Sequence, residues 1–142
     1  MKISQKGLEL IKKFEGCRLK AYQDSVGVWT IGYGTTNADK AITGTNIVSG
    51  LQISQRTADE WLRQSVDKKY GPKVEKYNAA YGWNQNEFDA LVCFAYNIGS
   101  IDQLTANGTR SRSMIAEKIL QYNKAGGKVF AGLTRRDRKS VV

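Results

Sequence analysis

The pattern of apolar residues changes abruptly at Gly16, and this change limits the folds available to the chain. Before the glycine, Leu8, Ile11 and Phe14 recur every third residue, which is typical of one apolar face of an α-helix. Ser4 can cap the start of that helix, and Gly16 can end it in a left-handed conformation. Runs typical of β-strands follow directly, so helix and sheet must pack together early in the chain.

Two runs typical of strands, Leu19–Tyr22 and Val28–Tyr33, flank the turn sequence Asp-Ser-Val-Gly at 24–27. Because side chains alternate along a strand, Thr30 and Gly32 share a face of small residues, where a sugar could approach closely. The pattern predicts a hairpin that carries one carboxylate in its turn and one hydroxyl in its second strand.

Three polar side chains of this region could act together: Glu15, Asp24 and Thr30. Glu15 lies in the last helical turn beside Phe14 and Cys17, where the helix dipole and poor hydration would both raise its pKa. Asp24 lies in a turn that water reaches, so we expect it to stay ionised. A protonated acid, a carboxylate and a hydroxyl suit the cleavage of a glycosidic bond. Spacing alone also fits a solvated helix end, a turn former and an ordinary strand residue.

The runs FEGCRLKAYQD and GVWTIGYGTT resemble the signature of the phage-type lysozymes, glycoside hydrolase family 24, which are endolysins that cut the cell-wall glycan. The resemblance implies that Glu15, Asp24 and Thr30 are the catalytic residues. Glu15 would protonate the oxygen between N-acetylmuramic acid and N-acetylglucosamine. Asp24, with Thr30, would position a water on the far face of the sugar, and the resemblance implies inversion at the anomeric carbon.

The resemblance also implies a set of substrate-binding residues: Gly32, Tyr33, Gly34, Tyr96 and Asn97. The last two belong to the run QNEFDALVCFAYNIG, which resembles a second block of the family. Polar and aromatic groups converge in such pockets. The competing interpretation of Asn97 is that it only caps a helix end.

A third block, YNKAGGKVFAGLTRR, suggests by analogy that Arg135 supports Glu15 as an ion-pair partner. Such a pair would lower the pKa of Glu15 and oppose the effect of the helix end. The chain departs from the family at Thr35, where a histidine is usual, and at Ser100–Arg112, where a longer helical insertion is usual. Its final run, Asp137–Val142, is also shorter than the helix that the family usually has there.

The second half of the chain is predicted to be helical. Ser54 can cap a helix that runs to about Lys69 and ends at Gly71-Pro72, and in the family such a helix links two lobes. Asn84-Gln-Asn-Glu87 is a capping box. It precedes a helix that is apolar nearly all round, which we expect to be buried and to end at Gly99.

These patterns predict an α+β, predominantly helical lysozyme-like fold, with a small antiparallel β-sheet lobe and a larger helical lobe flanking a cleft. We expect one domain over residues 1–142. The β-containing lobe spans about 16–56, and the helical lobe spans about 57–142 together with the N-terminal helix. The sheet, from residue 19 to about 50, forms one wall of the cleft.

The formal net charge of +9, from 22 Lys and Arg against 13 Asp and Glu, favours polyanionic partners but does not choose among them. With the resemblance, we expect peptidoglycan glycan strands and anionic cell-wall polymers as partners, and neither nucleic acid nor stable membrane insertion. We expect a monomer.

The sequence has no histidine and two cysteines, so it predicts no metal site and no cofactor. Cys17 and Cys93 are expected to be free thiols in a reducing compartment. No signal peptide is visible, and no run is long enough to cross a membrane. The resemblance implies synthesis in the host cytoplasm and release to the wall through a phage holin.

Two other functions stay open at this point. A lytic transglycosylase would cut the same bond with one acid and leave an anhydro sugar. A non-catalytic module would bind wall or nucleic acid through the positive charge, with salt-dependent affinity and no turnover.

Overall fold

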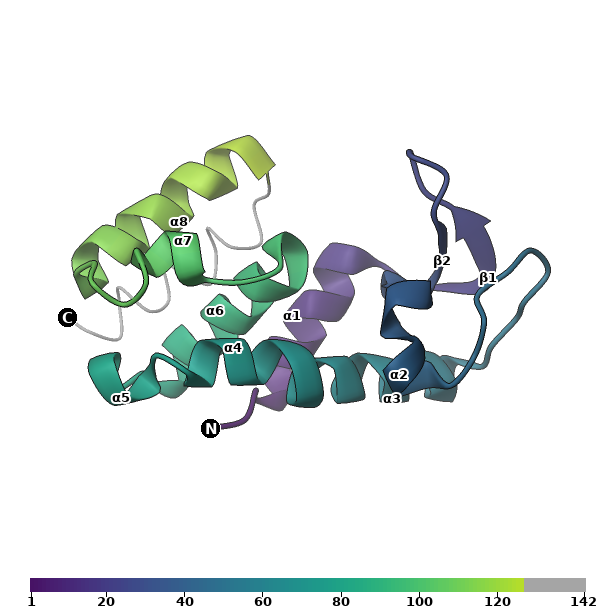
Figure 1. The fold of residues 1–142 in the computed structure, drawn as a ribbon, viewed down its shortest axis with the longest axis horizontal. Coiled ribbons are helices and arrows are strands. Elements are labelled where there is room, and N and C mark those ends of the chain that lie inside the picture. Colours follow the sequence, from purple (N-terminus) through teal and green to yellow (C-terminus); the bar gives the residue numbers. More distant parts are fainter. Residues whose placement is uncertain (127–142) are drawn as a thin grey trace.

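A computed structural model describes residues 1–126 of the chain, and the side chains of residues 1–121 (Figure 1). The helices and strands run in the following order: α1 Gln5–Glu15, β1 Arg18–Gln23, β2 Trp29–Gly32, β3 Thr35–Thr36, the 3-10 helix η1 Asn37–Asp39, α2 Lys40–Thr43, α3 Gln55–Ser65, the π-helix η2 Val66–Tyr70, α4 Gly71–Glu75, α5 Asn78–Tyr81, α6 Gln85–Ile98, α7 Asp102–Thr105 and α8 Arg112–Gly126.

Helix α1 begins and ends where the sequence predicts. The Ser4 side chain accepts a hydrogen bond from the backbone N–H of Gly7, and Gly16 follows the helix with φ +69°. Leu8 and Ile11 are buried against α6. The carboxyl of Glu15 is thereby fixed at the point where the helix gives way to the sheet.

Strands β1 and β2 form the expected antiparallel hairpin, and the short β3 extends the sheet. The pairing shifts between Arg18 and Tyr22: Arg18 is opposite Gly32, whereas Tyr22 is opposite Thr30. This irregularity gives β1 more residues than β2 over the same length, and such bulges bend a strand. The segment after Ile47 contributes one isolated bridge to β1, between Lys20 and Gln52.

The helix that starts at Ser54 does not end at Gly71-Pro72, as the sequence suggested. The Ser54 side chain caps α3 as predicted, by accepting from the backbone N–H of Thr57. At Gly71, however, the backbone N–H bonds to the carbonyl of Val66, five residues earlier. This π-turn shifts the register of the helix's backbone hydrogen bonds. Pro72 therefore falls in the first turn of α4, where a missing N–H is tolerated.

Helix α6 is buried as predicted, and it lies next to α1 on the helical side of the molecule (Figure 1). Its capping box, between Asn84 and Glu87, is formed in both directions. Its residues from Phe88 to Ala95 are all buried, and six of them belong to the larger hydrophobic cluster. A smaller cluster, of Ala21, Ile31, Ile47 and Trp61, lies under the sheet.

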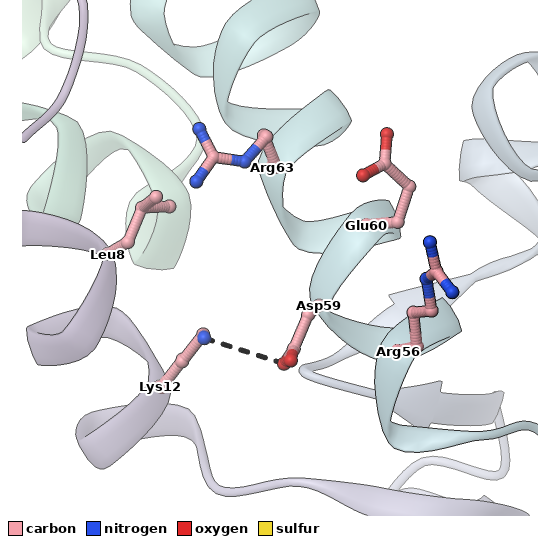
Figure 2. A pocket seen from close by; sticks show the side chains of 6 residues that line it. All are labelled: Leu8, Lys12, Arg56, Asp59, Glu60 and Arg63. Carbon is pink, nitrogen blue, oxygen red and sulfur yellow. Dashed lines mark ion pairs between the residues drawn. The ribbon is translucent and has the colours of Figure 1, made fainter. Parts of the chain in front are cut away.

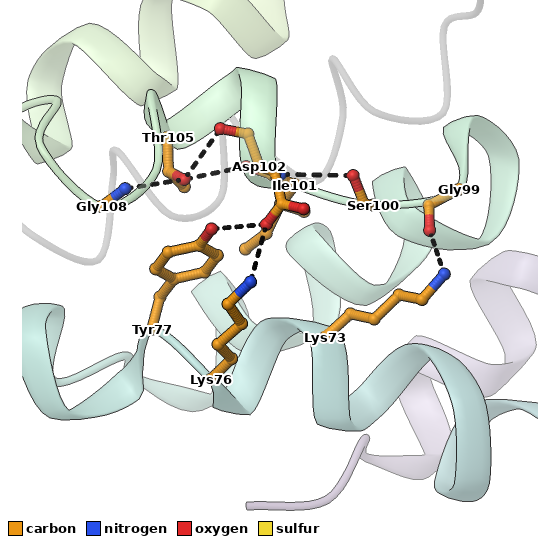
Figure 3. A network of polar contacts seen from close by, with 9 residues as sticks. All are labelled: Lys73, Lys76, Tyr77, Gly99, Ser100, Ile101, Asp102, Thr105 and Gly108. Atoms are coloured by element: carbon orange, nitrogen blue, oxygen red, sulfur yellow. Dashed lines mark hydrogen bonds and ion pairs between the residues drawn. The ribbon is translucent and has the colours of Figure 1, made fainter.

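The segment between α6 and α8 is fixed by polar contacts to α4 and to the two residues that follow α4 (Figure 3). The ammonium of Lys73 donates to the carbonyl of Gly99 at 2.6 Å, the hydroxyl of Tyr77 donates to Asp102, and Lys76 pairs with Asp102 at 3.4 Å. This segment contains the short helix α7, in the region where the family usually has a longer helical insertion.

Both cysteines are free thiols, as predicted; Cys93 is buried and Cys17 partly so. In residues 1–126, no helix is long and apolar enough to span a bilayer. The same residues contain no group of three or more potential His, Cys, Asp or Glu ligands for a metal ion.

Candidate active site

Glu15 lies in a pocket of about 150 Å³ whose lining residues come from parts of the chain that are far apart in sequence. The pocket lies where the end of α1 meets the sheet, the end of α3 and the end of α6. It is lined by Glu15, Gly34, Asp39, Ser65, Tyr70, Tyr96 and Asn97. Burial raises the pKa of the Glu15 carboxyl above its ordinary value of 4.5, because the surrounding protein disfavours the ionised form. The pocket therefore holds an acid that keeps its proton to higher pH than an exposed glutamate.

Gly34 gives Glu15 the room that it needs. The glycine has φ +86°, which disfavours other residues, and a Cβ atom on it would lie 3.6 Å from the Glu15 Oε2 atom. A larger side chain here would compete with a substrate for the space beside the carboxyl. Gly34 thus lies beside the Glu15 carboxyl, and its role in substrate binding stays a prediction.

Tyr96 joins the helical side of the pocket to the sheet side. Its hydroxyl donates a hydrogen bond to the backbone carbonyl of Tyr33, and its ring lies 5.0 Å from the ring of Tyr70. Burial, with the nearby Glu15 carboxylate, raises the pKa of the Tyr96 phenol well above 10.0, so the phenol remains a donor. Asn97, the next residue of α6, also lines the pocket.

Three pocket residues were missed by the sequence analysis: Asp39, Ser65 and Tyr70. Lys69 lies beside them and pairs with Asp39 at 3.3 Å, while its ammonium is 5.2 Å from the centre of the Tyr70 ring. Lys73 approaches the same ring at 5.4 Å. Tyr70 is thus held by flanking cations. No sequence signal points to it, because its place depends on the π-turn.

Tyr33 and Gly32, which the resemblance placed among the substrate-binding residues, are not among the residues that line this pocket. The Tyr33 side chain is only 6% exposed, and its hydroxyl donates to Asp59 of α3 at 3.1 Å. Its ring therefore serves the core, and only its backbone approaches the pocket. Gly32 is buried against α3: a Cβ atom there would lie 3.6 Å from the Cβ atom of Ala58.

Asp24 and Thr30 do not line the pocket that contains Glu15. Asp24 is exposed in the turn of the hairpin, and its Oδ1 atom accepts from the backbone N–H groups of Val26 and Val28, both at 2.9 Å. Thr30 is 5% exposed, and its hydroxyl donates to the carbonyl of Val28 at 2.9 Å. The Asp24 carboxylate can receive a ligand at its exposed side, whereas Thr30 supports the turn.

Arg135, the predicted supporting residue, lies outside the described residues. Thr35, which stands where the family usually has a histidine, is 3% exposed next to the pocket glycine. The hydroxyl there is therefore part of the packed interior of the sheet side.

A helix-end carboxyl in a pocket between a small antiparallel sheet and a helical cluster defines a protein of the α+β lysozyme-like fold. The chain belongs to the phage lysozyme family, whose sequence model matches residues 12–140.

Endolysins of several phages are similar to the chain in sequence. The endolysin of Lactococcus phage c2 is 41% identical over 138 residues, which are 96% of this chain. The chain spans 57% of the length of that relative. The endolysin of Salmonella phage P22 is 32% identical over 147 residues, which cover 100% of this chain and 97% of the relative.

Solved structures of the same fold are also similar. The muramidase domain of SpmX from Asticaccaulis excentricus has a TM-score of 0.66 at 28% identity, over 97% of this chain and 95% of that one. A P22 lysozyme mutant has a TM-score of 0.64 at 31% identity, over 97% of this chain and 94% of that one.

Proposed function

We propose that this protein is an endolysin that hydrolyses the β-1,4 bond between N-acetylmuramic acid and N-acetylglucosamine in bacterial peptidoglycan. The observation that carries the proposal is the Glu15 carboxyl, which lies in a pocket between sheet and helices with its pKa raised by burial. Membership of the phage lysozyme family supports the same substrate.

In this proposal Glu15 is the general acid. It transfers its proton to the bridging oxygen, so that the leaving sugar departs as a neutral alcohol. Gly34 leaves space beside the carboxyl, and Tyr70 and Tyr96 form the aromatic wall of the pocket. A sugar ring can lie against such a wall while its bridging oxygen faces Glu15.

Asp24 is proposed to act on the opposite face of the cleaved sugar. Its carboxylate would accept a proton from a water that attacks the anomeric carbon, which inverts the configuration there. Two backbone donors at Asp24 Oδ1 hold the carboxylate in one orientation, and Thr30 fixes the turn through the Val28 carbonyl. Thr30 is accordingly a positioning residue in this scheme.

One observation favours a second candidate, a lytic transglycosylase. Of the proposed trio, Glu15 alone lines the pocket. A transglycosylase uses one acid and no external water: the sugar's own 6-hydroxyl attacks the anomeric carbon and leaves a 1,6-anhydro end. Its substrate is the same glycan strand.

Product analysis tests these proposals. Purified peptidoglycan is digested with the full chain, and the fragments are weighed by mass spectrometry. Hydrolysis predicts reducing ends that have gained one water, and NMR of fresh products should show the inverted anomer. Anhydro ends would contradict hydrolysis and support the transglycosylase. An undigested wall would contradict both proposed activities.

The proposed place of action is the bacterial cell wall, after synthesis in the host cytoplasm. Release through a holin is the route that we propose, with anionic wall polymers as additional partners and a monomeric protein. A similar protein, from Haemophilus phage HP1 and 30% identical, is named a SAR-endolysin. The export route of the present chain is therefore worth testing by expression with and without a holin.

A further inference from the structure

A second and larger hollow, of about 320 Å³, lies between α1 and α3 (Figure 2). None of the residues proposed for catalysis lines it. It is lined by Leu8, Lys12, Arg56, Asp59, Glu60 and Arg63. Three of these side chains are cationic and two are acidic. Some of them form ion pairs with each other, and others do not.

Lys12 and Asp59 largely satisfy each other. The Lys12 ammonium lies 3.5 Å from Asp59 and also 3.5 Å from Glu9. Asp59 additionally accepts hydrogen bonds from Gln55 at 3.0 Å and from the Tyr33 hydroxyl at 3.1 Å. These contacts lower the pKa of Asp59, with the Gln55 bond as the largest cause. Lys12 and Asp59 therefore leave little net charge for a ligand.

Arg56 and Arg63 are the cations that remain. Both are exposed, and within the described part of the chain neither forms an ion pair. They are seven residues apart on α3, which places their Cα atoms about 10 Å apart along the helix axis. Figure 2 shows Arg63 reaching from α3 toward Leu8, with Arg56 further along the helix.

Glu60 lies between the two arginines in sequence and is the one carboxylate that would oppose an anion here. Its Oε1 atom accepts from the Gln64 side chain at 3.0 Å, and it pairs with no cation among the described residues. Two guanidinium groups face one carboxylate, so the hollow keeps a net positive charge.

The hollow is separate from the Glu15 pocket but is connected to it through Tyr33. The hydroxyl of Tyr33 contacts Asp59 in the hollow, whereas its carbonyl accepts from Tyr96, which lines the pocket. One residue therefore contacts the hollow with its side chain and the pocket with its backbone.

We propose that the hollow between α1 and α3 binds a phosphodiester polymer of the cell wall through Arg56 and Arg63. The guanidinium fork matches phosphate oxygens with two parallel hydrogen bonds. Because two guanidinium groups on one helix can each bind a phosphate, the pair favours a chain with repeated charges over a single small anion. This inference rests on the proposed wall-degrading function, which supplies the polymer beside the glycan.

Equilibrium binding of fluorescent poly(glycerol phosphate) to the full chain tests the proposal. Arg56→Gln/Arg63→Gln should weaken binding about tenfold, while the matched control Lys20→Gln/Lys40→Gln, which also removes two exposed positive charges, should weaken it about twofold or less. Glu60→Gln should tighten binding, because it removes the opposing carboxylate.

Equal losses in the two double variants would overturn the site, since net charge alone would then explain the affinity. Unchanged or weaker binding by Glu60→Gln would also contradict it. Duplex DNA at equal phosphate concentration serves as the competing polyanion. Equal affinity for DNA and for poly(glycerol phosphate) would contradict the assignment of the hollow to a wall polymer.

The assay contains no turnover, so its outcome does not depend on whether Glu15 is the catalytic acid. Digestion of peptidoglycan stripped of anionic polymer should proceed alike for wild type and Arg56→Gln/Arg63→Gln. Loss of that digestion would place the arginines in the glycan site and contradict a separate polymer site.

Discussion

Glu15 combines two features that both favour its protonated form. It lies in the last turn of α1, where the helix dipole disfavours negative charge, and the pocket walls remove part of its hydration. Ionisation of Glu15 raises the free energy of the folded protein relative to the unfolded chain, because water hydrates the carboxylate fully in the unfolded chain. A residue suited to proton donation is therefore also one that weakens the fold as pH rises.

Substituting Glu15→Gln should accordingly stabilise the protein near neutral pH. Well below 4.5 the carboxyl is protonated in both the folded and the unfolded chain, so the variant and the wild type should unfold alike. As pH rises through the raised folded pKa, the wild type alone loses stability. Thermal unfolding across pH measures this, with exposed Asp67→Asn as the control. A wild type more stable than the variant at neutral pH would contradict the raised pKa.

The element that most shapes the pocket is the π-turn between α3 and α4. It places Ser65 and Tyr70, at its two ends, in the wall facing Glu15. Gly71 is needed there for close backbone approach, since a Cβ atom on it would lie 2.9 Å from the Val66 carbonyl oxygen. π-Turns inside α-helices often occur at functional sites.

Gly71→Ala should therefore destabilise the fold by about 1–3 kcal/mol, because its methyl group meets backbone that cannot easily move. Urea unfolding measures the loss. Lys68→Ala, exposed in the same turn, is the matched control and should change stability by about 0.5 kcal/mol or less. Equal effects of the two substitutions would show that the turn tolerates a side chain at position 71.

A second structural link joins the start of α1 to α6. Asp89 is 2% exposed and accepts hydrogen bonds from the Ser4 backbone, the Ser4 hydroxyl and the Gln85 side chain. Asp89→Ala leaves those donors without their acceptor and should cost about 2–4 kcal/mol in the free energy of unfolding. Unfolding in guanidinium chloride measures this loss, with Asp67→Ala as the control variant. A loss no larger than the control would mean that water replaces the carboxylate.

Local signals in the sequence predicted the helix boundaries well. Ser4, Gly16 and the Asn84 capping box each act within one helical turn, so a short stretch of sequence contains all the information. The helix end expected at Gly71-Pro72 was wrong. A glycine and a proline can also be accommodated where the backbone hydrogen bonds of a helix shift from the α pattern to the π pattern. That outcome depends on packing between α3, α4 and α6, which no short stretch reveals.

Residues of the candidate site could be predicted only where several of them lie in one continuous segment of the sequence. Glu15 and Gly34 lie close together in the fold because the hairpin between them folds back. Tyr70 and Asp39 come from segments that meet only in the folded protein, so spacing could not indicate them. Tyr33 was assigned to substrate from its motif, whereas its burial makes it a core residue.

At the scale of the whole molecule, the net charge of +9 would attract the protein to the anionic wall proposed as its substrate. Long-range attraction of this kind is screened as ionic strength rises, whereas contacts inside a pocket are screened less. If the proposed function holds, the charge and the Glu15 pocket make separable contributions to lysis: the charge would concentrate the protein at the wall, and the pocket would act on the glycan.

Raising the salt concentration from about 0.05 M to about 0.3 M should slow lysis of intact walls several-fold. Cleavage of a soluble, uncharged glycan oligomer should change little over the same range. Turbidity loss and oligomer chromatography give the two rates. Equal salt effects on both substrates would mean that the charge acts on the chemistry or the fold rather than on approach to the wall.

The most direct measurement of the central claim is the rate at which Glu15→Gln digests purified peptidoglycan, compared with wild type and with Glu9→Gln, an exposed glutamate of the same helix. If Glu15 donates the proton, its variant should fold normally and lose nearly all digestion, while Glu9→Gln should digest like wild type. A folded Glu15→Gln variant that digests the wall at the wild-type rate would contradict the account.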